Sequence, residues 1–129
     1  MIKIGIVGAG EKEWTDEQKF LVKEKIRKII GEHLKDGITL VSGHCHSGGV
    51  DIWAEEVADE LGIKKEIYPA QVKRWSNIGC FKGYHSRNIQ IAENCDVLYD
   101  IEPKSKRSGG TWTLEYLKKC GGKGYKIEI

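Results

Sequence analysis

The sequence predicts an α/β protein with a doubly wound, five-stranded parallel sheet and helices on both faces. Two observations favour this class. Short apolar runs alternate with longer segments in which apolar residues recur every three or four positions, and this order of strand and helix continues to the C-terminus. The 129 residues contain no linker or internal repeat, so residues 1–129 are expected to form one domain.

The first half of the chain contains three predicted strands and two predicted helices. The strands are the apolar runs 2–7, 38–41 and 63–68. The first helix starts at Thr15 and Gln18, which match the pattern of a capping box, and apolar residues continue at helical spacing as far as Leu34. The second helix, 50–61, is amphipathic and is closed by Gly62.

The second half adds two strands and two helices. The helices are expected at 84–94 and 111–119, and the strands at 96–101 and 125–129. The last strand alternates apolar with charged residues, as an edge strand does. Strands that alternate with helices in this way indicate a Rossmann-like fold.

Three glycine-bearing loops follow predicted strands. They are residues 8–10, 42–49 and 108–110. The carboxyl ends of parallel strands meet at one edge of the sheet, where such folds bind ligands. We therefore expect the three loops to converge on one crevice.

The loop before the last helix predicts a phosphate site. Ser108, Gly109 and Gly110 lead into the helix, so backbone N–H groups and the positive end of the helix dipole would face the crevice. Thr111 offers a hydroxyl donor, and basic residues within 104–107 add positive charge. The alternative is a solvated loop without a ligand.

The loop SGHCHSGGVD, residues 42–51, is expected to hold the sugar or base. Glycines such as Gly43 would let a ligand touch the backbone. Asp51 lies in the first helical turn, where a carboxylate would repel a phosphate but could accept hydrogen bonds from hydroxyls or orient a water. It could equally do no more than complement the helix dipole. His44 and His46 are expected to contact a phosphate or sugar.

A metal site in this loop is an alternative. His44 and His46 could point the same way from an extended loop. Further ligands would have to come from Cys45, Cys80 or His85, which no spacing rule requires. The cysteines lie far apart, with no CxxC pair, and are expected to be free thiols in a reducing cytoplasm; no cofactor is expected.

Charge and hydropathy restrict the partners. The 21 Lys and Arg residues and 19 Asp and Glu residues leave a net charge of +2, too small to indicate nucleic-acid binding. No apolar run is long enough for a membrane span and no signal-peptide pattern is present, so a cytoplasmic protein is expected. Trp14, Trp75 and Trp112 are expected to be exposed, for a homo-oligomer interface or for stacking on a base.

Four segments, taken in order, resemble the motifs of the YspA-like branch of the SLOG superfamily. They are VGAG…EWTD, SGHCHSGGVDIWAEEVA, WSNIGCFKGYHSRNIQIAENCDVLYDI and SGGTWTLEYLKKCGGKGYKI. Other members are the LOG phosphoribohydrolases and the DNA-processing protein DprA. The resemblance implies a Rossmann-like domain that binds a nucleotide or a nucleotide-derived ligand. The implied contact residues are Gly8, Gly10, Gly48, Gly49, Asp51, Arg87, Asn88, Gly109, Gly110 and Thr111.

Three functions are consistent with these observations. The first is a nucleotide-binding sensor or carrier that acts through an effector protein or a homo-oligomer. The second is a hydrolase of the N-glycosidic bond in a nucleoside monophosphate or an ADP-ribose-like compound. Its oxocarbenium-like transition state would need a carboxylate from Asp51 or Glu115, with Arg87 fixing the phosphate. The third is metal binding through His44 and His46.

Overall fold

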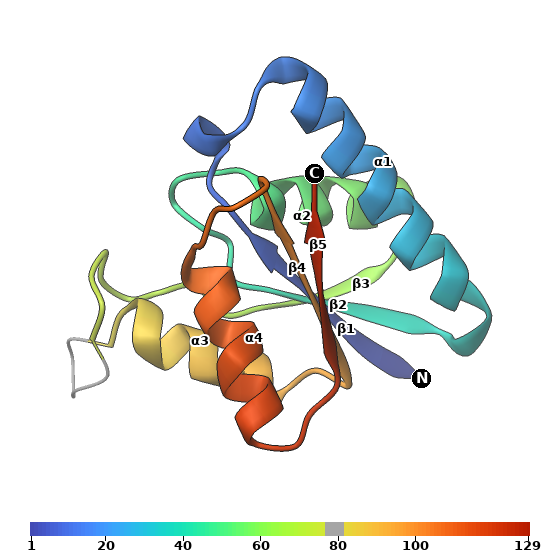
Figure 1. Cartoon of the computed structure of the whole chain (residues 1–129). Helices are drawn as coiled ribbons and strands as arrows, with labels where there is room; N and C mark the ends of the chain where they lie inside the picture. Colours follow the sequence, from blue (N-terminus) through green and yellow to red (C-terminus); the bar gives the residue numbers. More distant parts are fainter. Residues whose placement is uncertain (77–81) are drawn as a thin grey trace.

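The computed structural model describes residues 1–76 and 82–129 of the chain. Its strands form one sheet in the order β3-β2-β1-β4-β5, and every neighbouring pair is parallel (Figure 1). The strands are β1 (Ile2–Gly8), β2 (Ile38–Ser42), β3 (Lys64–Ile67), β4 (Val97–Glu102) and β5 (Gly124–Glu128). Strand order reverses between β1 and β4, so the predicted Rossmann-like α/β class is confirmed.

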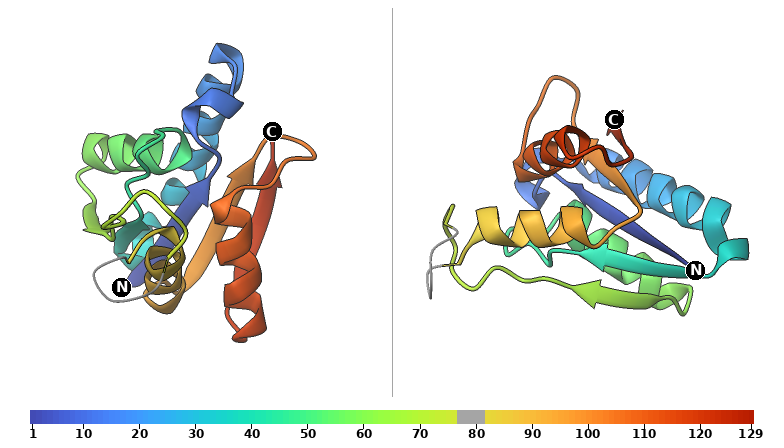
Figure 2. Two further views of the ribbon diagram at one scale, coloured as in Figure 1. Left: turned by 90° about the vertical axis from the view of Figure 1, so that its left-hand side faces the viewer. Right: turned by 90° about the horizontal axis from the view of Figure 1, so that it is seen from below.

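Helices cover both faces of the sheet (Figure 2). The helices are α1 (Asp16–His33) and α2 (Val50–Glu60) on one face, and α3 (Tyr84–Glu93) and α4 (Gly109–Lys119) on the other. Because side chains alternate along a strand, Ile4 and Ile6 of β1 pack toward α1 and α2, whereas Val7 packs toward α3 and α4. The cluster on the α1–α2 side is the larger of the two.

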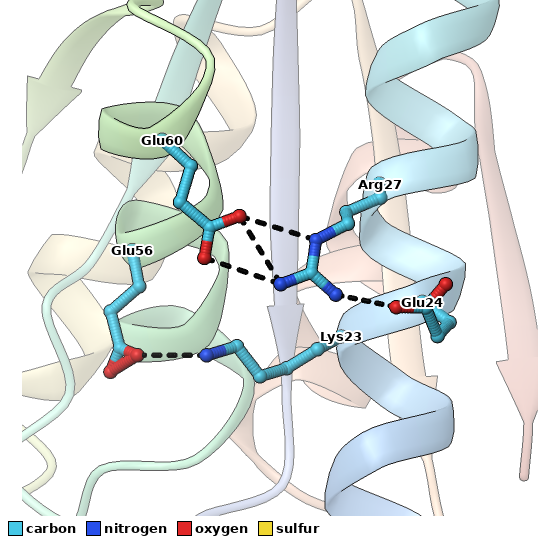
Figure 3. Close-up of polar contacts among 5 residues, drawn as sticks. All are labelled: Lys23, Glu24, Arg27, Glu56 and Glu60. Carbon is cyan, nitrogen blue, oxygen red and sulfur yellow. Dashed lines mark hydrogen bonds and ion pairs between the residues drawn. The ribbon is translucent and has the colours of Figure 1, made fainter.

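Ion pairs join the outer sides of α1 and α2 (Figure 3). The Nζ atom of Lys23 lies 3.1 Å from Glu56 Oε2. Two nitrogens of Arg27 lie 3.2 Å from the carboxylate of Glu60, and Nη1 lies 2.6 Å from Glu24 Oε1. Exposed pairs of this kind each stabilise a protein little, and the buried cluster shared by α1 and α2 accounts for most of their packing.

The ends of two helices differ from the expectation. The capping box of Thr15 at α1 is confirmed, but α1 ends at His33 and Leu34 begins a short 3₁₀ turn in which it is 51% exposed. Leu34 is therefore not a core residue, because the chain leaves the helical path there and turns toward β2. Helix α4 starts at Gly109 rather than at Thr111, which places both glycines in its first turn.

No helix in the described parts of the chain combines the length and the apolar character needed to cross a membrane.

Candidate functional site

Two adjoining cavities lie at the carboxyl edge of the sheet. The deep cavity, of about 110 Å³, is lined by Val7, Gly8, Gly10, Cys45, Asp51, Asn88, Ile91, Ser108, Gly109 and Gly110. The outer cavity, of about 420 Å³, is lined by Cys45, Ser47, Trp75, Tyr84, Arg87, Ser108, Gly109 and Trp112. They share Cys45, Ser108 and Gly109, so we treat them as one crevice. All three glycine-bearing loops contribute to it.

Ser108 caps the start of α4 with its own side chain. Its Oγ atom accepts a hydrogen bond from the Gly110 N–H at 3.0 Å and donates one to Glu102 at 2.5 Å. The Thr111 hydroxyl accepts from the Ser108 N–H at 3.2 Å and is buried, so it faces the cap and does not line the crevice. The α4 residues that do line the crevice in its first turn are Gly109 and Gly110, which present backbone.

A buried pair of carboxyl groups lies beneath this cap. Asp100 and Glu102 occupy alternate positions at the end of β4, and both are 0% exposed. Both Asp100 oxygens and Oε1 of Glu102 have no hydrogen-bond partner among the described residues. Burial and the adjacent Glu102 raise the pKa of Asp100 to about 9, although the Thr111 hydroxyl and the charge of Lys126 oppose this. The buried pair of Asp100 and Glu102 therefore keeps a proton at neutral pH.

Arg87 and Asn88, in the first turn of α3, connect two of the loops. Arg87 is buried, with Nη1 donating to the Gly43 carbonyl at 2.6 Å and Nε donating to Asn88 Oδ1 at 2.7 Å. Asn88 Nδ2 donates to the Gly109 carbonyl at 3.3 Å. A Cβ atom on Gly43 would lie 2.4 Å from Arg87 Nη1, so only glycine allows this approach. Gly43 thus positions the guanidinium.

Asp51 is a buried carboxyl at the wall of the deep cavity. It is 5% exposed and accepts a hydrogen bond from the backbone N–H of Cys45. Burial raises its pKa to about 6; the charge of Arg87 lowers it and that of Glu55 raises it further. A carboxyl that titrates near neutral pH beside a cavity can exchange a proton with a ligand.

His44 pairs with the carboxylate of Glu55 and does not line the crevice. Its Nδ1 lies 2.8 Å from Glu55 Oε1, and Glu55 also accepts from the Ser42 hydroxyl at 2.8 Å. A carboxylate accepts hydrogen bonds, so Nδ1 carries the proton and, in the neutral ring, Nε2 is the acceptor. Neither cavity is lined by His44.

The metal alternative lacks a ligand set in the described residues. No three His, Cys, Asp or Glu side chains gather there as a metal site. Cys80, one of the ligands considered from the sequence, lies outside the residues that the structure describes.

The loop before α2 packs against the first loop. The Val50 N–H donates to the carbonyl of Ala9 at 3.2 Å. Gly49 has a φ of +82°, and a Cβ atom there would lie 2.3 Å from the same oxygen. Gly48 and Gly49 line neither cavity, so they serve this packing.

Glu115 lies away from the crevice. Its two carboxylate oxygens each lie 2.8 Å from a guanidinium nitrogen of Arg107, on the exposed side of α4. The structure therefore does not bring Glu115 to the place where a glycosidic bond would be cleaved.

The acid pair at Asp100 and Glu102 is the part of this region that the sequence analysis missed. The available signal was two acidic residues, two positions apart, at the end of a strand expected to be buried.

Comparison with known proteins finds no protein-family model that matches the chain and no curated protein that matches it.

Proposed function

We propose that the crevice binds a nucleotide or a nucleotide-derived small molecule. One observation carries the proposal: a small cavity bordered by glycine backbone and the start of α4 opens into a larger cavity beside a buried arginine. A phosphate would lie beside Arg87 and Gly109, where the two cavities meet, and the base in the outer cavity. The resemblance to SLOG domains supports the same ligand class.

The start of α4 and Arg87 favour an anionic group. The positive end of the α4 dipole attracts an anion near Gly109, whereas the Gly110 and Thr111 N–H groups are already bonded to Ser108. Hydrogen bonds to Gly43 and Asn88 hold the Arg87 side chain in place through two nitrogens, and a guanidinium has five N–H donors in all. A pre-positioned guanidinium loses little side-chain entropy when it binds an anion. We further propose that the protein is a cytoplasmic sensor or carrier, and that it acts through an effector protein or as a homo-oligomer.

A thermal-shift screen tests the binding. The protein is heated with nucleoside mono-, di- and triphosphates, ADP-ribose and NAD, each well above its expected dissociation constant. A ligand at about 100 times its dissociation constant stabilises the folded state by about 2.7 kcal/mol, which raises the Tm by several degrees. Ligand recovered intact by mass spectrometry would indicate a binding protein. No shift with any of these compounds would overturn the proposal.

Cleavage of an N-glycosidic bond is a second candidate, favoured by Asp51. Its carboxyl borders the deep cavity and titrates at about 6, so it can act as an acid or a base on a ribose that enters this cavity. Mass spectrometry should then find free base and ribose phosphate with the wild type and neither with Asp51→Asn. Glu115→Gln is the matched control and should retain turnover, because Glu115 lies away from the crevice. Loss of turnover in this control would contradict the assignment.

A further inference from the structure

Aromatic rings at the mouth of the crevice belong to neither hydrophobic core. Trp75, Tyr84 and Trp112 line the outer cavity, and the two core clusters of the described residues do not include them. Trp75 is 51% exposed. Large rings that border a cavity and stay in contact with water are typical of a surface that binds a ligand.

These rings hold one another in place. Trp75 and Trp112 meet edge to face, with centroids 4.9 Å apart and an angle of 84° between their planes. The ring of His85 lies 5.1 Å from Trp75 and 5.0 Å from Trp112, and Tyr116 stacks on Trp112 at 5.3 Å and 12°. Rings this close fill the space between them, so the cluster is no cage for an ammonium group. A ligand would lie against the side that faces the outer cavity.

Trp14 and Trp53, by contrast, contribute to the hydrophobic core and not to the crevice. Trp53 is 2% exposed and lies in the core on the α1–α2 side, 6.4 Å from Trp14 between ring centroids. Trp14 packs against the same core, and its indole N–H donates to the Ala9 carbonyl at 3.2 Å. Trp14 therefore has a structural role, unlike Trp75 and Trp112.

We infer that the outer cavity is the base subsite of the nucleotide site, where a planar nucleobase stacks on the exposed ring of Trp75 and also contacts Trp112, whose ring plane lies at 84° to that of Trp75. This inference rests on the proposed nucleotide function and adds the part of the ligand that the aromatic rings recognise. The cavity of about 420 Å³ lies within the usual range for small-molecule sites. Base–aromatic stacking tolerates many bases, because each base has a π face.

The crevice holds groups suited to both parts of a nucleotide. The outer cavity is lined by aromatic rings and by Arg87, whose guanidinium carbon lies 5.3 Å from the centroid of Tyr84, and Gly109 lines both cavities. A ligand that is planar at one end and anionic at the other meets suitable chemistry at both ends. A sugar phosphate without a base would leave the rings uncovered.

Isothermal titration calorimetry with ligands that differ only in the base tests the subsite. The ligands are AMP, GMP, CMP, UMP and ribose 5-phosphate, which lacks the base. We expect at least one nucleotide to bind the wild type roughly tenfold or more tightly than ribose 5-phosphate does, and to quench tryptophan fluorescence. Trp75→Leu should weaken that nucleotide about tenfold or more and leave ribose 5-phosphate unchanged. Phe20→Leu is the control, because Phe20 is a 64% exposed ring on α1 that does not line the crevice.

The outcomes separate the two proposals. If ribose 5-phosphate binds as tightly as every nucleotide, or if Trp75→Leu weakens both kinds of ligand equally, the base subsite is wrong while the phosphate site stands. If neither the nucleotides nor ribose 5-phosphate bind, the base subsite is wrong, and the nucleotide proposal fails with it when the thermal-shift screen also finds no ligand. The fluorescence measurement uses the wild type, so it decides the matter even if the variant folds poorly; no quenching by a bound nucleotide would overturn the subsite.

Discussion

Helices α2 and α4 both follow glycine-rich loops, yet they begin in opposite ways. At α2 the Val50 N–H is taken by the carbonyl of Ala9, and Gly49 is pressed against the same oxygen. At α4 the cap comes from the local side chain of Ser108, and Gly109 lines both cavities. The loop before α2 uses Gly49 to pack against Ala9, whereas Gly109 at the start of α4 borders both cavities. Glycine content alone therefore does not identify a ligand loop.

Replacing one glycine in each loop tests this difference, and we expect the largest loss of stability at the start of α2. Gly49→Ala places a Cβ atom 2.3 Å from the Ala9 carbonyl at a φ of +82°, so we expect a loss of about 2–4 kcal/mol in the free energy of unfolding. Gly109→Ala meets only Asn88 Nδ2, at 3.3 Å, and should keep the wild-type Tm while weakening nucleotide binding. Urea denaturation and calorimetry measure the two effects. A stable Gly49→Ala variant would contradict the packing role.

The buried carboxyls near the starts of α2 and α4, Asp51 and Asp100, should make the free energy of unfolding depend on pH over different ranges. Native Asp51 has a pKa of about 6, above its ordinary 3.8, so the native state binds more protons than the unfolded state between these values. Wild-type stability should therefore fall from pH 4 to 6, and Asp51 should cause no further change with pH above pH 7. Asp51→Asn removes this dependence and should gain up to about 3 kcal/mol at pH 7.5 relative to pH 4. Urea denaturation at the two pH values gives the difference; equal gains at both would refute it.

Asp100, beneath the start of α4, should make stability fall with rising pH over a higher pH range than Asp51 does. Its pKa of about 9 means that its proton is lost only on the alkaline side, so wild-type stability should keep falling between pH 7 and 9. The slope from this group is about 1 kcal/mol per pH unit. Asp100→Asn mimics the protonated carboxyl and should flatten this part of the stability curve, whereas Asp51→Asn should not. A curve that is already flat in the wild type would show that Asp100 is ionised at neutral pH.

Glu115 should give the smallest effect. It lies on the exposed side of α4 and pairs with Arg107, and exposed ion pairs contribute little to stability. Glu115→Gln should therefore leave the Tm and the affinity for nucleotide unchanged in thermal-shift and calorimetric measurements. A clear loss of affinity would mean that the outer side of α4 takes part in binding after all.

The sequence was sufficient for the sheet and for the position of the crevice. Apolar runs alternating with amphipathic segments predict the five parallel strands, and loops that follow such strands must meet at one edge. The role of each loop glycine was not predictable, because it depends on which backbone lies opposite. Gly49 faces the carbonyl of Ala9, forty residues earlier in the chain, and Gly43 faces Arg87, forty-four residues later.

Side chains near the helix starts were also assigned from local pattern alone. Thr111 was expected to face a phosphate, but the capping box turns its hydroxyl toward Ser108. Glu115 was a candidate catalytic carboxylate only for a hydrolase, and the structure pairs it with Arg107 on the exposed side of α4. Such details follow from tertiary contacts that no spacing rule contains.

Alkylation of Cys45 can measure how much of the crevice is occupied by a ligand. Its thiol lies where the deep and outer cavities join, so an alkylating reagent and a ligand would compete for the same space. The same chain supplies two internal standards: Cys120 is exposed, and burial raises the pKa of Cys95 to about 11, which suppresses its thiolate. Peptide mapping after a short pulse of iodoacetamide would then measure occupancy at one sulfur against two others, even in a crude extract and before the ligand has been identified.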